Sequence, residues 1–318
     1  MRNIFGKIRK SLTSKVGVVS NWVILLTFSA GLFSSFFDLT SLAELGIFIV
    51  LMITLGIPHG ATDHIVFFSQ KNRENKLTSW KYFLLFYLGT MLAYACAWYF
   101  LPLFCFIVFL AFSAYHFGQS QLYYLTIESK KWLKTLLYFF WGSTLLLSIL
   151  GFNADETLSI LSGTPFIEPM KYILARFEYI LIANIAVLVA LLVNLATRKK
   201  ISFSKVLQEL ALLILLLFLC WSVSLLLTFA IYFALWHSLQ TIEKEIKVFD
   251  DCFEKGYSLK EYGRDVLPFS LISFLGIGII LTGLYFFEFS TPNLLFVFFV
   301  LISILTAPHA LLIESIYD

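Results

Sequence analysis

The sequence predicts an all-α protein, a polytopic integral membrane bundle of about ten transmembrane helices. Of its 318 residues, 59% are hydrophobic and 14% are charged, whereas a soluble domain has roughly 45–50% apolar and about 25% charged residues. The apolar runs are continuous rather than alternating, which favours helices over a β-barrel. No long polar segment separates them, so we expect one membrane-embedded domain over 1–318 with a basic N-terminal tail, 1–19.

Ten segments approach or exceed the roughly 20 apolar residues that a membrane-spanning helix needs. They are 21–37, 43–69, 81–101, 103–124, 135–151, 172–197, 204–220, 222–246, 266–288 and 292–316. Pro102 separates the third from the fourth, and Pro292 begins the last, where its missing N–H has no cost. The run 204–246 is too long for one span, so we divide it near Trp221.

The positive charges predict the orientation of these helices. Apart from Lys171 and Arg176, every lysine and arginine lies in the N-terminal tail or in the alternate loops 70–81, 125–134, 198–205 and 244–264. Such loops face the cytoplasm in most membrane proteins. We therefore expect both termini to be cytoplasmic and the protein to be multi-pass in the cell (inner or plasma) membrane. These cationic loops indicate topology, and no nucleic-acid partner is expected.

All five histidines lie within apolar segments. His59, His116, His237 and His309 fall in the second, fourth, eighth and tenth predicted helices, which all run from the outside inwards. At a rise of 1.5 Å per residue, their depths agree within roughly 6 Å. Ionisable groups are expensive in the bilayer and mark functional sites there. We interpret the four imidazoles, at one level in the cytoplasmic half of the membrane, as ligands of a metal.

A second polar layer lies one turn further inwards. Asp63, Gln119, Gln240 and Thr241 stand three or four residues after a histidine, on the same helical face. A metal-bound histidine usually donates its second N–H to such a group, so these four residues are candidates to accept that hydrogen bond and orient the metal-binding rings. Asp63 is expected to be the only deeply buried acid.

His64 follows His59 by five residues, which is about 140° around an ideal helix. Both histidines cannot bind one metal from a regular helix, so His64 is an outer-shell group or an occasional ligand. Gly56, Pro58 and Gly60 could break that helix, as Pro308 could before His309.

An all-imidazole site suits iron, copper, zinc or nickel. Four histidines on octahedral Fe(2+) leave two positions for dioxygen and substrate. Zinc hydrolysis would need a carboxylate base at the open position. Haem would need small residues beside the porphyrin, for which Gly56, Gly60 and Gly118 are the candidates.

The histidine motifs resemble those of a known family. The resemblance rests on residues 56–63 (Gly-Ile-Pro-His-Gly-Ala-Thr-Asp), 113–118 (Ser-Ala-Tyr-His-Phe-Gly), 232–238 (Tyr-Phe-Ala-Leu-Trp-His-Ser) and 307–311 (Ala-Pro-His-Ala-Leu). These four ordered motifs are similar to those of the Brp/Blh family, the bacteriorhodopsin-related-protein type of β-carotene dioxygenase. Thr241 stands where many members have a further histidine, so His309 or His64 is expected to complete the ligand set.

The resemblance implies a membrane-embedded non-haem iron dioxygenase that cleaves the central 15,15′ double bond of β-carotene with O2. The product is retinal, often supplied to a microbial rhodopsin. The catalytic residues and iron ligands would then be His59, His116, His237 and His309, and the substrate β-carotene or a related carotenoid. Six aromatic residues beside the histidines could line a tunnel for the polyene: Phe112, Tyr115, Phe117, Tyr232, Phe233 and Trp236.

Two other functions remain open, and only the first of them uses the same histidines. A membrane haem or metal-ion binding or transport protein would carry polar residues at several depths along a path. An assembly factor for a retinal protein would tolerate replacement of the histidines by alanine.

Overall fold

The computed structural model describes residues 19–37, 39–69, 76–125, 127, 129–253 and 256–317, and these form helices without strands. Nine helices in this part of the chain are long and apolar enough to cross a membrane. α2 (Asn21–Phe36) is a shorter apolar helix. The predicted polytopic helical membrane protein is therefore confirmed, and α2 with the nine longer spans corresponds to the ten expected segments.

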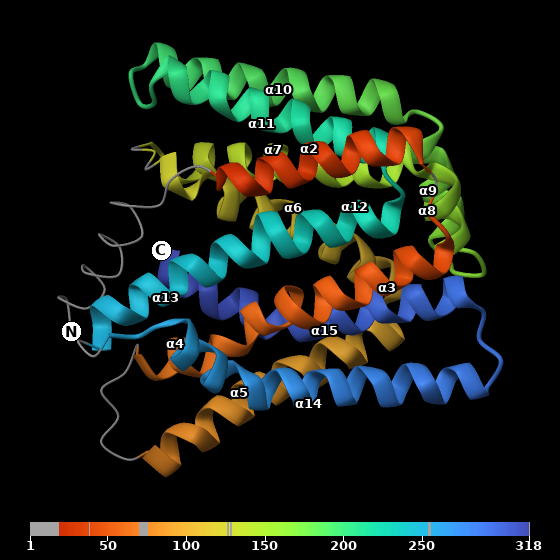
Figure 1. Ribbon diagram of the computed structural model, residues 1–318, viewed down its shortest axis with the longest axis vertical. Coiled ribbons are helices and arrows are strands. Elements are labelled where there is room, and N and C mark those ends of the chain that lie inside the picture. The colour runs from red at the N-terminus through yellow and green to blue at the C-terminus, as the bar shows by residue number, and fades with distance from the viewer. Residues whose placement is uncertain are drawn as a thin grey trace.

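The helices that make up these spans lie side by side along one direction of the bundle (Figure 1). Their bounds are α3 Ser41–Leu51, α4 Asp63–Ser69, α5 Lys76–Phe100, α6 Pro102–Leu122, α7 Lys131–Phe152, α10 Phe177–Thr197, α11 Phe203–Ser222, α12 Leu225–Ile231, α13 Leu239–Phe253, α14 Leu259–Phe286 and α15 Thr291–Tyr317. Two of the spans contain non-α turns in their interior. A π-helix, η1 (Met52–Gly56), and a 3-10 helix, η2 (Pro58–Thr62), join α3 to α4, while a π-helix, η4 (Tyr232–Ser238), joins α12 to α13.

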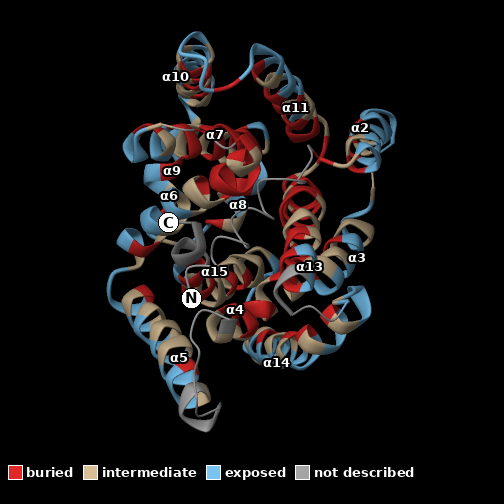
Figure 2. Ribbon diagram, turned by 90° about the vertical axis from the view of Figure 1, so that its left-hand side faces the viewer, coloured by how far each residue is buried: buried red, intermediate tan, exposed pale blue. Residues whose placement is uncertain are grey.

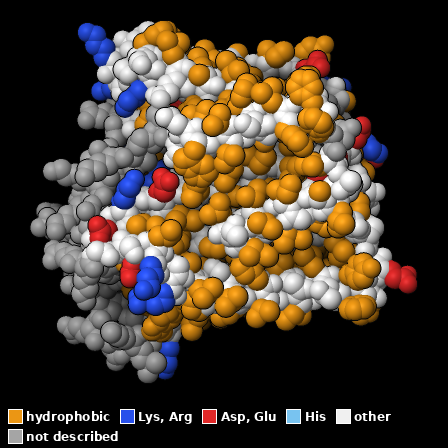
Figure 3. All heavy atoms as spheres, viewed as in Figure 1, with side chains coloured by type: hydrophobic (Ala, Val, Ile, Leu, Met, Phe, Trp, Pro, Cys, Tyr) orange, Lys and Arg blue, Asp and Glu red, His pale blue; other side chains and the backbone are white. Residues whose placement is uncertain are grey.

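The distribution of hydrophobic and charged side chains on the surface is the one expected of a protein in a bilayer. In the view of Figure 3, hydrophobic side chains cover the middle of the molecule and charged ones lie towards its two ends. α2 begins and α15 ends at the same end of the bundle (Figure 1), as an even number of spans requires. The tail before Val19 and the loop residues 70–75, with Lys71 and Arg73, lie outside the described residues.

Several predicted boundaries differ from those of the helices, and two of the differences have a clear structural cause. α14 begins at Leu259 rather than 266, because Ser258 and Glu261 form a capping box there. The helix expected over 172–197 begins at Phe177, after two short helices, α8 (Ala154–Ile160) and α9 (Ile167–Leu174).

α8 and α9 close one end of the bundle, at the right in Figure 1. Phe166 and Met170 are buried there, so a segment expected as a loop is an apolar cap. Glu156 in α8 accepts a hydrogen bond from the backbone N–H of Leu225 at 3.0 Å. Partial burial raises the pKa of this carboxyl group.

Helices α6 and α7 approach each other closely because each has a glycine at the contact. A Cβ added to Gly118 would lie 1.9 Å from the carbonyl oxygen of Tyr138, and one added to Gly142 would lie 1.8 Å from that of Ala114. Small residues allow such contacts between membrane helices. Buried residues concentrate on the inner helices, including α7 and α12, whereas α10, α2 and α14 expose an outer face (Figure 2).

Candidate metal centre

Four histidines from four segments of the chain surround one position in the bundle. The ring centroids of His59 and His237 are 5.0 Å apart, and those of His116 and His237 are also 5.0 Å apart. His309 completes the group, with its centroid 5.4 Å from His59 and 6.0 Å from His116. Each of these four ring pairs is steeply inclined, with interplanar angles of 72–87°.

Non-α geometry places two of these rings. His59 lies in the 3-10 helix η2, directly after Pro58, and His237 lies in the π-helix η4. Single π turns inside α-helices frequently occur at functional sites. The expected break near Gly56, Pro58 and Gly60 is therefore present. The break expected at Pro308 is not, because α15 continues through it.

His59 and His309 each use the Nδ1 nitrogen in a hydrogen bond to the protein. Nδ1 of His309 lies 2.7 Å from Oδ1 of Asp63. Nδ1 of His59 contacts the carbonyl oxygen of Gly56 and lies 3.1 Å from Oγ of Ser238, whose hydroxyl donates to the carbonyl of Phe233. Nδ1 is thus the donor in both neutral rings, which leaves Nε2 unprotonated and able to bind a metal.

The histidine that Asp63 contacts by a hydrogen bond is His309, in α15, rather than His59, which stands four residues earlier in the chain. The other oxygen of Asp63, Oδ2, accepts a hydrogen bond of 2.8 Å from the hydroxyl of Tyr87 in α5. Sequence spacing missed Tyr87 and Ser238, because both reach the site from other helices. The only feature of the sequence that could have indicated Tyr87 is its polar hydroxyl group within an otherwise apolar helix.

The donor set fits a metal ion. Imidazoles that share one metal through nitrogens at about 2.1 Å have ring centroids roughly 4.5 to 6.5 Å apart, as these rings do. Nδ1 of His237 is buried without a hydrogen-bond partner in the described part of the chain, and such a nitrogen calls for a ligand. Within the same residues, no three donors of His, Cys, Asp or Glu are already drawn together as in a filled site. Binding would therefore require the rings to move from the positions that they have in this structure.

The other predicted site residues, Gln119, Thr241, Gln240 and His64, are not part of this group of four imidazole rings. Gln119 donates to the hydroxyl of Tyr115 at 3.1 Å, and Thr241 donates to the backbone carbonyl of His237 at 2.8 Å. Nε2 of Gln240 is buried without a partner among the described residues. The ring of His64 packs against Trp80 and Phe269, with centroids 5.9 and 4.4 Å away.

The expectation that Asp63 is the only deeply buried acid was wrong. Glu209 and Glu245 are also buried. Glu245 accepts hydrogen bonds from Thr62 at 2.9 Å and from Tyr262 at 3.1 Å, while Tyr124 donates to Glu209. Polar partners contributed by distant helices make this burial possible, and a count of residues from helix ends does not reveal them.

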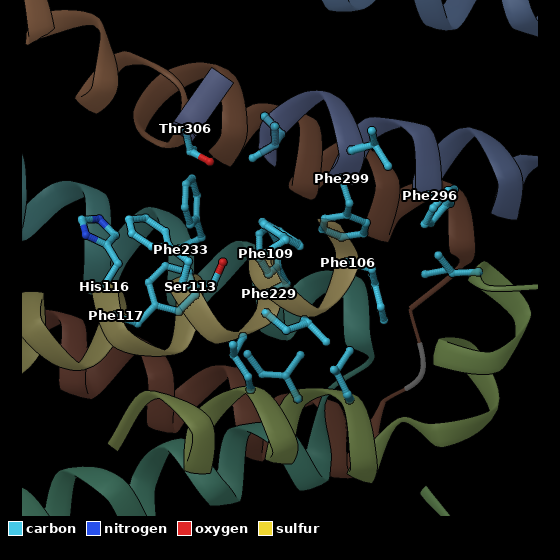
Figure 4. Close-up of a pocket in the computed structure, with 18 of the residues that line it drawn as sticks. Phe106, Phe109, Ser113, His116, Phe117, Phe229, Phe233, Phe296, Phe299 and Thr306 are labelled. Atoms are coloured by element: carbon cyan, nitrogen blue, oxygen red, sulfur yellow. The ribbon is translucent and has the colours of Figure 1, made fainter. Parts of the chain in front are cut away.

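All four histidines line a cavity whose other side chains are mainly apolar and aromatic. It contains about 1210 Å³ of space between atoms, part of it open to the surroundings, and extends from the histidines to α8 and α9; because these two helices cap its far end, we call it the enclosed cavity. Phe233 and Phe117 lie beside His116, while Phe106 and Phe296 lie further along it (Figure 4). On α15 it extends from His309 to Phe296, which is about 20 Å at 1.5 Å per residue.

Comparisons with known proteins identify the family. The family model described as beta-carotene 15,15′-dioxygenase matches residues 50–317. A curated relative, the beta-carotene 15,15′-dioxygenase of uncultured marine bacterium 66A03, is 27% identical over 274 residues, which cover 85% of this chain and 92% of the relative. No solved structure matches the chain significantly. The family match spans all four histidines, and the protein therefore belongs to the beta-carotene 15,15′-dioxygenase family of carotenoid-cleaving oxidoreductases.

Proposed function

We propose that the protein is a membrane-embedded, non-haem iron dioxygenase that cleaves the central double bond of β-carotene, or of a related carotenoid, with O2. The reaction inserts one oxygen atom at each carbon of the alkene, so that the C=C bond is replaced by two aldehydes, both retinal. One observation supports this most directly: four imidazoles lie in the wall of a long cavity lined mainly by apolar and aromatic side chains.

His59, His116, His237 and His309 would hold Fe(2+), which supplies the electrons that allow dioxygen to react with an alkene. Asp63 and the paired acceptors Gly56 and Ser238 fix the tautomers of His309 and His59. Phe233 packs against both His59 and His237, with centroids 5.4 and 5.5 Å away. Its ring would hold the polyene beside the histidines, and the apolar wall would keep water from the products.

The geometry favours this function over haem or ion transport. Gly118, which was a candidate to lie beside a porphyrin, packs instead against the backbone of Tyr138. Away from the histidines, the enclosed cavity offers only the hydroxyls of Ser113, Thr157 and Thr306, of which Thr157 and Thr306 donate to backbone carbonyls. A path for ions needs polar groups at several depths.

We further propose that the end of the bundle at which α2 begins and α15 ends faces the cytoplasm of the cell membrane, because the segments of the sequence expected on that side carry most of the lysine and arginine. A carotenoid dissolves in the bilayer, so the enzyme would take its substrate from the lipid. The retinal could pass to a microbial rhodopsin in the same membrane.

The test is production of the protein in a bacterial host that accumulates β-carotene, followed by chromatography of the extracted pigments. We expect retinal from the wild type and none from His116→Ala. Tyr99→Ala, which removes an aromatic ring that is 81% exposed in α5, is the control and should retain activity.

Other apocarotenals in place of retinal would refute central cleavage. Unchanged carotene from folded, iron-loaded wild-type protein would refute the carotenoid substrate. Retinal from His116→Ala would refute the four-histidine site and favour an assembly role.

A further inference from the structure

A second hollow reaches the same histidines from the opposite side of α15. It lies between α5, α14, α15 and the segment η1–η2, and it contains about 1460 Å³ of space between atoms. We call it the side groove. His59, Gly60 and His309 line its inner end, and Leu88, Ile272 and Gly276 lie along its walls.

The side groove and the enclosed cavity adjoin at the candidate metal centre, where the residues that they share form the wall between them. Five residues line both of them: His59, Phe233, Ile302, Thr306 and His309. Two of the four histidines thus form the boundary between the two spaces. A long molecule lying partly in each would pass these imidazoles with its middle.

The two spaces differ at their far ends. α8 and α9 cap the enclosed cavity through the buried residues Thr157, Leu161 and Met170. Side chains in the walls of the side groove face the surrounding lipid: Leu88 is 57% exposed and Ile272 is 67% exposed. Since both belong to membrane-spanning helices, the side groove opens laterally towards the bilayer.

We propose that the side groove is a second half-site for the carotenoid, open along its wall to the bilayer. One half of the substrate, a ring with its polyene arm, lies in the enclosed cavity, and the other half lies in the side groove. The central double bond then rests beside His59 and His309. This inference depends on the proposed carotenoid substrate, and it explains central cleavage by the position of the histidines between two half-sites.

A third hollow, between α5, α6 and α15, provides a comparison. Ala93, Ala97 and Leu311 are among the residues that line it, and no histidine does. It meets the enclosed cavity at Phe109, Phe112, Ser113 and Thr306, on the side of His116, whose ring lies 6.4 Å from that of Phe112, and not between His59 and His309. A carotenoid half placed there would not continue past His59, so we assign the second half-site to the side groove.

The test places a large side chain in the side groove by substituting a glycine of α14. A Cβ added to Gly276 meets nothing within 4 Å, and the same holds for Gly278, which does not line the groove. Gly276→Phe should lower cleavage of β-carotene by about tenfold or more, as expected for obstruction of a binding site. Gly278→Phe, on the same helix, and Ala93→Phe, in the third hollow, should remain within about twofold of the wild type.

Two further measurements separate a blocked groove from a damaged enzyme. A shortened apocarotenal, with one intact ring half and its other end cut back, should be cleaved by Gly276→Phe at nearly the wild-type rate. In metal-free protein reconstituted with β-carotene in lipid nanodiscs, Gly276→Phe should retain less pigment per chain than Gly278→Phe. Because this binding assay requires no cleavage, it tests the groove even if the proposed reaction proves wrong.

Equal losses with Gly276→Phe and Gly278→Phe, or with the full-length and shortened substrates, would overturn the proposal. So would unchanged pigment binding in Gly276→Phe. A selective loss in Ala93→Phe would transfer the second half-site to the third hollow.

Discussion

His309 and His237 face the same centre but are held in different ways. His309 is fixed by a chain of hydrogen bonds, through Asp63 to the hydroxyl of Tyr87. His237 has no hydrogen-bond partner for Nδ1 among the described residues, and its ring packs against Phe117 and Phe233, with centroids 5.2 and 5.5 Å away. One side of the centre is therefore positioned by polar contacts and the other by packing.

This difference suggests a division of tasks. A carboxylate behind an imidazole raises the basicity of the ring and fixes its tautomer, and both effects strengthen metal binding. Packing alone fixes where a ring lies and leaves its nitrogens free. The polar side should therefore control metal affinity, whereas the packed side should control stability and the shape of the cavity.

The largest effect is expected from Asp63→Ala, which removes the acceptor of His309. Loss of such a partner typically lowers metal affinity or activity by about 10- to 100-fold. Asp63→Asn should recover part of this loss, because its side-chain oxygen can still accept from Nδ1. The measurement is iron retained against increasing chelator, and equal retention by Asp63→Ala and wild type would remove the distinction between the two sides.

Gly118→Ala tests the packed side. The new Cβ would overlap the carbonyl of Tyr138, forcing α6 away from α7 and displacing Phe117 and His116. Overpacking of this kind costs about 1–3 kcal/mol, which a lower thermal unfolding temperature would reveal. Gly89→Ala, where a Cβ meets nothing within 4 Å, is the matched control, and an equal shift in both variants would contradict the close α6–α7 contact.

Tyr87→Phe should have a smaller effect, because it removes one of two partners of Asp63 and leaves the bond to His309. A hydrogen bond to a charged group contributes about 1.5–3 kcal/mol, and only part of it should reach the metal. We expect iron affinity to fall less than in Asp63→Ala, with the rest of the lost bond energy appearing as a lower thermal unfolding temperature. A loss as large as that of Asp63→Ala would mean that Tyr87 acts directly at the centre.

Ser238→Ala should have the smallest effect. Nδ1 of His59 would lose Ser238 as a partner but would retain the carbonyl of Gly56. Iron retention and activity should therefore stay within about threefold of the wild type. A much larger loss would show that Ser238, rather than Gly56, sets the tautomer of His59.

The sequence alone determined the fold class and the position of the centre along the chain. Continuous apolar runs can satisfy their backbone hydrogen bonds in a bilayer only as helices, and the cost of burying imidazoles there singled out His59, His116, His237 and His309. Helix periodicity placed these residues at a similar depth. Those inferences need only local spacing and composition.

Tertiary structure decided which side chains support which histidine. Asp63 was predicted from spacing to act near His59, yet it contacts His309 across the bundle, and Tyr87 and Ser238 reach the centre from other helices. The π and 3-10 turns around His237 and His59 change the face that each residue presents, so ideal helical angles could not predict these pairs. The two hollows that meet at His59 and His309 likewise arise only when distant helices pack, because a cavity is a property of the space between helices.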